Sequence, residues 1–169
     1  MTDAEFRDAF HGHKDVVHRF AYRMTGSASA AEDVVQDCFL ILWRKPAAYD
    51  PSRGGMRAFL LGIARNLILK RWRDERPHEQ LEDAFIGQPL NVLDDDRSQA
   101  VEKAILMLPP LQREAVVLAE YEEMSLEEIA RTTAADLAAV KSRLHRARQN
   151  LRRMLAHLLE PRGAFHGTK

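Results

Sequence analysis

Apolar side chains recur every three or four positions along most of the chain, which is the period of an amphipathic α-helix. This spacing predicts an all-α fold. The predicted helices cover residues 2–25, 29–45, 56–74, 98–108 and 111–121, followed within 125–155 by a short helix, a tight turn and a longer helix.

The helix ends are predicted from capping residues, which pair with the free backbone amides of a first helical turn, and from a proline. Thr2–Glu5, Ser29–Glu32 and Ser125–Glu128 each have the form of a capping box, in which a hydroxyl and a carboxylate accept hydrogen bonds from otherwise unpaired amides. Asp136 is a good N-cap for the last helix. Pro46 should stop the second helix, because proline lacks the amide that a helix interior needs.

The long helix predicted after Asp136 has one apolar stripe and a basic surface. No acidic residue occurs between Asp136 and Glu160 to compensate the charge. The stripe consists of Leu137, Val140, Leu144, Ala147, Leu151 and Leu155, and the bases off it are Lys141, Arg143, Arg146, Arg148, Arg152 and Arg153. A helix with one apolar face and one basic face that lacks acidic residues is typical of a protein that binds the phosphate backbone of a nucleic acid.

The helix predicted over 29–45 carries a leucine on its polar face. Leu40 lies three or four residues from polar and charged side chains of that face, which are Asp33, Gln36, Asp37 and Arg44. An apolar side chain within a polar rim has the form of a small contact site. The alternative is a solvated face with one exposed leucine, which by itself needs no explanation.

The helix predicted over 56–74 follows a turn-rich loop and ends in bases. Its predicted buried side is Phe59, Leu60, Ile63, Ala64, Leu67 and Ile68, and its basic end contains Arg65, Lys70, Arg71, Arg73 and Arg76. Trp72 lies among the arginines, a composition used to stack single-stranded bases and neutralise their backbone. The alternative is a basic helix end that complements its own dipole, with Trp72 half-buried.

The length of 169 residues allows one compact domain or two small ones. The segment from Pro77 to about Asp96 contains Gly87, Pro89 and six acids before the first base, Arg97, and it predicts an acidic linker between two domains. Its acids account for a net charge of zero in a chain with two basic surfaces. Such a linker either mimics nucleic acid in a basic channel or serves solubility.

Other features indicate a soluble, cytoplasmic protein. Cys38 is the only cysteine, so no internal disulfide is possible, which suits a reducing compartment. The first residues have no apolar core of a signal peptide, and no apolar run approaches the roughly 20 residues that span a bilayer.

Patterns for catalysis and cofactor binding are weak. The glycines form neither a dinucleotide-binding motif nor a P-loop. His11, His13 and His18 lie near Asp15, and we interpret them as exposed helix histidines rather than metal ligands. Cys38 lies on an apolar face, which favours a packed side chain over a nucleophile. No catalytic, cofactor or metal site is therefore predicted, and an enzyme is not expected.

Four segments resemble one protein family. Ala31–Arg44, A-E-D-V-V-Q-D-C-F-L-I-L-W-R, is similar to the A-E-D-L-V-Q-E-x-F-L-x-x-W-R segment of bacterial RNA polymerase sigma factors of the extracytoplasmic-function (ECF) group. I-A-R-N-L from Ile63 resembles the start of that family's segment for the minus-ten promoter element. L-P-P-L-Q-R-E from Leu108 and V-K-S-R-L-H-R-A-R from Val140 resemble its minus-thirty-five domain, in the family's order and spacing.

The resemblance implies a promoter-specificity subunit whose domains have separate partners. Residues 1–76 would form sigma region two, 77–97 the acidic linker, 98–160 the helix-turn-helix of region four, and 161–169 a disordered tail. Core RNA polymerase and promoter DNA would be the partners, with an anti-sigma factor as inhibitor and no membrane insertion. The implied polymerase-binding residues are Asp33, Gln36, Asp37, Leu40 and Arg44.

Two DNA contacts follow from the same resemblance. The minus-ten residues would be Tyr49, Arg53, Arg57, Asn66, Lys70, Arg71, Trp72 and Arg73, and the minus-thirty-five residues Lys141, Ser142, Arg143, His145, Arg146 and Arg148. Asn66 suits a flipped base because its amide offers both a donor and an acceptor. Arg148 and Arg152 are expected on phosphate, which positions DNA without specifying sequence.

The chain departs from the family pattern in the turn of the helix-turn-helix. Ala134 replaces the usual turn glycine, and Ala135 replaces a buried isoleucine. An alanine at positive φ costs around 1 kcal/mol relative to glycine. The missing isoleucine methylenes remove about 2 kcal/mol of burial. We therefore expect unusual promoter preference, or reliance on polymerase to hold this domain in place.

Two other functions remain compatible with the residues. A helix-turn-helix regulator that never joins polymerase would bind duplex DNA with the second domain, usually as a dimer. A pure interaction protein held by a partner is the third alternative. A stable homodimer that shifts duplex DNA without polymerase would favour the regulator.

Overall fold

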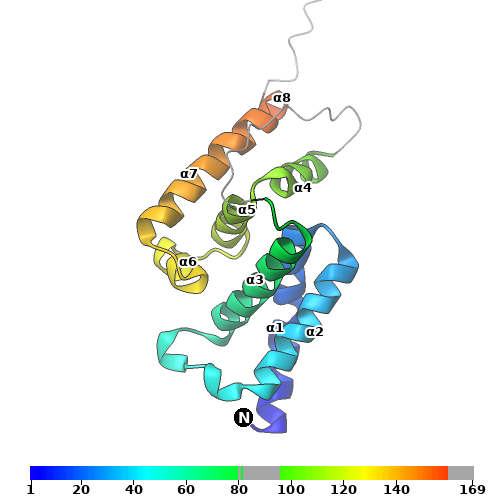
Figure 1. Ribbon diagram of the computed structural model, residues 1–169, viewed down its shortest axis with the longest axis vertical. Coiled ribbons are helices and arrows are strands. Elements are labelled where there is room, and N and C mark those ends of the chain that lie inside the picture. Colours follow the sequence, from blue (N-terminus) through cyan, green and yellow to red (C-terminus); the bar gives the residue numbers. More distant parts are fainter. Residues whose placement is uncertain (80, 82–95, 160–169) are drawn as a thin grey trace, which may run out of the picture.

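The computed structural model describes residues 1–79, 81 and 96–159, and every element in these ranges is helical (Figure 1). The main helices are α1 (Asp3–Thr25), α2 (Ala28–Arg44), α3 (Met56–Glu75), α4 (Arg97–Met107), α5 (Pro110–Val116), α6 (Leu126–Thr133), α7 (Leu137–Met154) and α8 (Ala156–Leu159). Short 3₁₀ helices η1 (Pro46–Ala48) and η2 (Pro51–Arg53) join α2 to α3, and the π-helical turn η3 (Val117–Tyr121) extends α5.

Helices α1, α2 and α3 pack on one another as a first bundle. Their apolar stripes meet in a core that fully buries Phe20, Leu42 and Leu60. The capping box predicted at Thr2–Glu5 starts α1, with the Thr2 hydroxyl and the Glu5 carboxylate each accepting a backbone amide. Gly26 ends α1 in the left-handed conformation, with φ 68°.

Helices α4 to α8 with η3 form a second bundle, in which α5 packs along α7. Its core includes Leu118, Ile129, Val140 and Met154. The predicted capping box at Ser125–Glu128 starts α6. In η3 the Glu122 amide donates to the Val117 carbonyl over 3.2 Å. This hydrogen bond spans five residues, whereas an α-helical hydrogen bond spans four, so the turn contains one additional residue.

The start of α2 differs from its prediction. The N-cap is Ser27, whose hydroxyl accepts the Ala30 amide over 3.2 Å, and the helix begins at Ala28 rather than after Ser29. The reason is the position of Gly26, because α1 ends there and Ser27 is the first residue with extended backbone. The predicted stop at Pro46 is confirmed, since α2 ends at Arg44.

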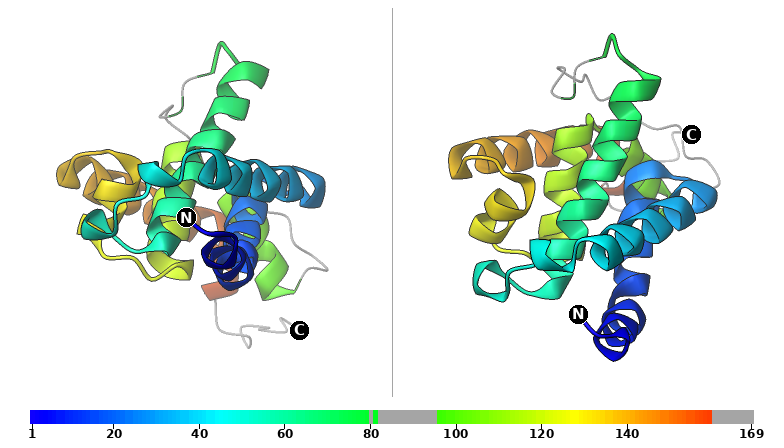
Figure 2. Two further views of the ribbon diagram at one scale, coloured as in Figure 1. Left: turned by 90° about the horizontal axis from the view of Figure 1, so that it is seen from below. Right: turned by 60° about the horizontal axis from the view of Figure 1, so that its bottom comes forward.

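The two bundles are in contact, with α3 between α6 on one side and α1 and α2 on the other (Figure 2). Helix α1 also touches α4, α5 and η3. The predicted buried side of α3 is right for Leu60, Ala64 and Ile68, whereas Phe59, Ile63 and Leu67 are only partly buried. Leu61 and Leu69 are buried in addition, because neighbours cover α3 on more than one side.

Two predicted segments fall largely outside this description. The linker predicted over 77–97 is described only at its ends, and the tail predicted over 161–169 lies outside the described residues. Among the described helices, none has both the length and the apolar composition that crossing a lipid bilayer would require.

Candidate functional site

The polar face of α2 is accessible along its length. The rim residues Asp33, Gln36, Asp37 and Arg44 are exposed. Leu40, in their centre, keeps 39% of its surface exposed although it lies on a packed helix. The structure therefore brings the predicted polymerase-binding residues onto one open face. Their role stays a prediction.

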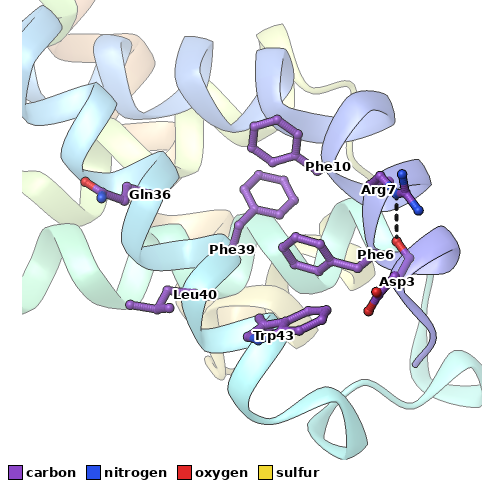
Figure 3. Close-up of a pocket in the computed structure, with 8 residues that line it drawn as sticks. All are labelled: Asp3, Phe6, Arg7, Phe10, Gln36, Phe39, Leu40 and Trp43. Atoms are coloured by element: carbon purple, nitrogen blue, oxygen red, sulfur yellow. Dashed lines mark hydrogen bonds between the residues drawn. The ribbon is translucent and has the colours of Figure 1, made fainter.

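An aromatic groove adjoins this face, and the sequence reasoning missed it (Figure 3). Phe6 and Phe10 from α1 and Phe39 and Trp43 from α2 line a hollow of about 680 Å³ that reaches Leu40. Trp43 is 47% exposed and stands edge-on to Phe6, with ring centroids 4.9 Å apart. The spacing of these residues predicted their helices, but only the packing of α1 on α2 reveals the opening between them.

The loop between α2 and α3 presents part of the predicted minus-ten set. The Asp50 carboxylate caps η2 by accepting hydrogen bonds from Ser52, and these bonds lower the pKa of Asp50. Arg53 is exposed, and the Tyr49 ring lies 5.3 Å from that of Phe59. Asn66 is exposed and accepts a hydrogen bond from Arg65.

Arg57, also predicted for the minus-ten element, is engaged by the second bundle. Its guanidinium donates to the Glu122 carbonyl over 2.9 Å and also to the Glu122 carboxylate. Glu122 follows η3 and is 4% exposed. In this arrangement Arg57 pairs with an acid of the same chain.

The basic end of α3 is divided between open and covered residues. Lys70 and Arg73 are exposed, and Arg71 lies 3.7 Å from the Asp33 carboxylate. The Trp72 ring is half-buried, with the Arg76 guanidinium 4.1 Å and the Arg113 guanidinium 5.6 Å from its centroid. Arginines of the same chain thus occupy positions over a ring that was predicted to stack on bases.

Helix α7 presents most of the predicted minus-thirty-five residues to solvent. Lys141, His145, Arg146 and Arg148 are exposed, whereas Ser142 and Arg143 are half-buried. The positive surface thus remains accessible on the side of α7 that faces away from its core.

The packed side of α7 follows the predicted stripe in its middle. Val140, Leu144 and Ala147 are buried, whereas Leu137 at the tip is 37% exposed. The sequence reasoning missed Asn150, which is buried and donates to Gln112 over 2.8 Å. This hydrogen bond ties α7 to α5.

The turn before α7 has the predicted strained backbone. Ala134 has φ 50° and ψ 42°, the left-handed conformation that glycine adopts without strain. Ala135 is partly buried and packs against the core. Asp136 occupies the predicted N-cap position, but its carboxylate makes no capping hydrogen bond to α7.

The contact between the bundles contains a buried ion pair that the sequence did not reveal. Arg65 Nε donates to Glu114 Oε2 over 2.7 Å and Nη2 donates to Oε1 over 2.9 Å. The Arg65 side chain is 14% exposed and that of Glu114 only 1%. Burial raises the pKa of Glu114, while the charges of Arg65 and Arg143 act in the opposite direction.

A second buried arginine joins the bundles through backbone groups. Arg113 donates to the Met24 carbonyl in the last turn of α1 and to the carbonyls of Leu106 and Leu108 at the end of α4. A cation is favourable at these helix ends, where carbonyl dipoles converge. Burial lowers the pKa of Arg113 to about 10.

The histidines considered as metal ligands lie at the surface, and the cysteine considered as a nucleophile lies in the core. His11 is exposed and His13 and His18 are partly exposed, and the described residues contain no group of three or more His, Cys, Asp or Glu that could hold a metal ion. Cys38 is fully buried, as predicted, and burial raises the pKa of its thiol to about 12.

Comparison with known proteins assigns both bundles. Residues 9–78 match the model of sigma-70 region 2, and residues 98–151 match that of sigma-70 region 4. The chain is 30% identical to ECF RNA polymerase sigma factor SigW of Bacillus subtilis, over 90% of each chain. It is 37% identical to ECF sigma factor SigE of Mycolicibacterium smegmatis over 85% of this chain, which spans 59% of that relative.

Two solved structures have the same fold. The sigma factor RpoE from Bartonella quintana, in complex with the anti-sigma factor NepR, superposes with a TM-score of 0.72 at 26% identity, covering 90% of this chain and 97% of that one. CnrH, in complex with the cytosolic domain of CnrY, gives 0.67 at 25% identity, covering 94% and 89%. With both sigma-70 regions matched in order on a chain whose described elements are all helical, this protein belongs to the ECF group of bacterial RNA polymerase sigma factors.

Proposed function

We propose that this sigma factor binds core RNA polymerase and directs promoter-specific initiation by contacting two promoter elements and helping to open the DNA. The observation that carries this proposal is the succession of sigma region two and region four in one chain. The chain itself performs no catalysis; it selects where the polymerase starts.

The first bundle would hold polymerase and the minus-ten element on different surfaces. The exposed α2 face around Leu40 suits the clamp helices of the largest polymerase subunit, since an apolar centre with a charged rim favours a specific, reversible contact. The α2–α3 loop and Asn66 would capture a flipped base, and Lys70 and Arg73 the adjoining backbone.

The second bundle would read the minus-thirty-five element with α7 in the major groove. Arg146 and Lys141 are exposed and suit base-edge contacts. Arg148 pairs with Glu120 over 2.7 Å, both half-exposed, which suits a phosphate contact better than base readout. We assign the domains as residues 1–76 and 98–160, and we propose that the protein acts in the cytoplasm.

We further propose an anti-sigma factor as a partner. Two proteins of the same fold were solved in complex with other proteins, the sigma factor RpoE with the anti-sigma factor NepR and CnrH with the cytosolic domain of CnrY. The present chain aligns with nearly the full length of both.

Reconstitution with core RNA polymerase tests the proposal. Purified chain and core enzyme are incubated with a pool of genomic fragments, and the transcripts are sequenced to map their start sites. Defined starts that share upstream elements are expected. Core enzyme alone is the control. Absence of any promoter-specific start, together with a homodimer that shifts duplex DNA alone, would favour the helix-turn-helix regulator instead.

A further inference from the structure

The tip of α7 carries an exposed leucine that the core does not use. Leu137 is the first residue of the helix and keeps 37% of its surface exposed. The packed side of α7 begins one turn later, at Val140, which is 1% exposed. The apolar stripe in the sequence thus included one residue whose side chain remains available to a partner.

Exposed side chains continue along α7 from this leucine. Leu137, Lys141 and His145 follow one another at intervals of four residues, a spacing that places them on one side of a helix, and all three are exposed. Ala138 is exposed beside Leu137. Helix α7 lies on the outer side of the second bundle, away from α1 and α2 (Figure 1). Leu137 therefore stands at the N-terminal end of the surface that carries Lys141 and His145.

The composition of the tip does not suit a phosphate contact. Between Arg131 and Lys141 the chain has no lysine, arginine or histidine, and its one charged residue is the exposed Asp136. Phosphate binding depends on neutralisation by cations, and a carboxylate is repelled by the DNA backbone. What the tip can contribute is apolar contact, from Leu137 and Ala138.

The major groove of DNA offers one apolar group for such a contact. Among the four bases, thymine alone presents a methyl group there, at C5, beside the hydrogen-bonding groups of the base edges. The N-terminal residues of a recognition helix are those that approach these edges. A leucine at the first position of α7 can cover the methyl group and remove it from water.

We propose that Leu137 is a specificity-determining residue, which recognises a thymine of the upstream promoter element through the C5 methyl group of the base. This inference rests on the proposed binding of α7 to the minus-thirty-five element. Base recognition by α7 is then divided along the helix. The tip makes an apolar contact, and Lys141 and Arg146 supply hydrogen bonds further along.

Replacement of thymine by deoxyuridine tests this contact, because it removes the methyl group and leaves base pairing intact. Holoenzyme made from the full chain and core polymerase is titrated with a duplex promoter that was identified by mapping transcript starts. Each thymine of the upstream element, on either strand, is replaced in turn. Binding should weaken about fourfold at one position, the factor that corresponds to about 0.8 kcal/mol for one buried CH₂ group.

Substitutions of Leu137 connect the effect to this side chain. Leu137→Ala should bind the natural promoter more weakly and lose its sensitivity to deoxyuridine, because alanine is too short to reach the methyl group. Leu137→Met should keep that sensitivity, since methionine is apolar and of similar volume. Thermal melting checks that both variants fold, as expected for an exposed position.

Arg152→Ala is the control for a general loss of affinity. It should weaken binding to natural and substituted promoters by the same factor, because a phosphate contact does not depend on the base. The fourfold difference between the two promoters should therefore persist in this variant.

The outcomes separate the inference from the proposed function. If the wild-type holoenzyme binds its promoter and tolerates deoxyuridine at every position, the inference is wrong and the proposed function stands. An equal effect of deoxyuridine on wild type and Leu137→Ala would assign the methyl contact to another residue and overturn the inference as well. If the holoenzyme recognises no promoter, the proposed function fails and the inference fails with it.

Discussion

Arg65 and Glu114 lie 49 residues apart in the sequence and form a two-pronged ion pair between the bundles. Removing one member of a buried pair in fixed surroundings costs about 3–5 kcal/mol. Separation of the bundles would instead return the remaining charge to water. Glu114→Ala should therefore lower the free energy of unfolding by less than that amount, while amide hydrogen exchange in α6 becomes faster.

Urea denaturation followed by circular dichroism, together with hydrogen exchange, measures both effects. A full loss of about 3–5 kcal/mol in one cooperative transition would show instead that the bundles behave as one rigid unit.

Leu40→Asp should weaken binding to core polymerase and leave the fold intact. Leu40 is 39% exposed, so an aspartate there remains hydrated, but it would place a charge in the apolar centre of the proposed contact. Co-purification with core enzyme measures binding, and thermal melting checks the fold. Leu42→Asp is the contrast, because Leu42 is fully buried and its replacement should unfold the first bundle. Unchanged co-purification of Leu40→Asp would remove this face from the polymerase interface.

Arg146→Ala should weaken minus-thirty-five recognition by about 1–3 kcal/mol if the guanidinium contacts a base edge. Arg146 is exposed on the basic side of α7. Holoenzyme binding to a series of single-base promoter variants is the measurement, and specificity should relax at one position. Arg152→Ala, expected to remove a phosphate contact, should weaken all sequences alike. A uniform loss for Arg146→Ala as well would reassign that residue to phosphate.

Ala134→Gly should stabilise the second bundle. Ala134 has φ 50°, where an L-residue is strained by about 1–2 kcal/mol and glycine is not. Glycine also gains freedom in the unfolded chain, which leaves a net increase of about 0.5–1 kcal/mol. Ala135→Gly provides the control, since Ala135 packs against the core and should lose stability. Thermal melting of both variants gives the comparison, and a lower melting temperature for Ala134→Gly would contradict strain at this turn.

Cys38 should resist alkylation in the folded chain. Its thiol is fully buried, donates to the Leu60 carbonyl over 3.4 Å, and has its pKa raised by burial from 9.0 to about 12. Because the folded state holds this proton more tightly, its contribution to stability is complete below pH 9.0 and declines as the pH rises toward 12. Iodoacetamide should label the chain in denaturing urea and not under native conditions. Rapid native labelling would indicate that the core between α2 and α3 opens.

The sequence predicted local features well because they depend on neighbouring residues. The boxes at Thr2 and Ser125, the stop before Pro46 and the left-handed Ala134 all follow from groups within a few positions. The start of α2 was wrong by two residues because Ser27 and Ser29 are both good caps, and the left-handed Gly26 decides between them.

The contact between the bundles could not be predicted in the same way. Periodicity identifies which side of a helix is buried but not which element buries it. Leu61 and Leu69 therefore fell outside the predicted side of α3, and the burial of Arg113 was not predicted. The aromatic groove beside Leu40 was missed for the same reason, since two helices form it together.

The number of residues in the π-helical turn η3 determines which side chains of the second bundle point toward the first. Its amide from Glu122 reaches back five residues to Val117, so every later residue is rotated relative to a regular α-helix. In this register Glu120 faces Arg148 in its own bundle, while Glu122 faces Arg57 in the other. Loss of a single residue from this turn would rotate the following side chains by about 100° about the helix axis without altering any charge. Related sigma factors could thus gain or lose the internal contact through one insertion or deletion.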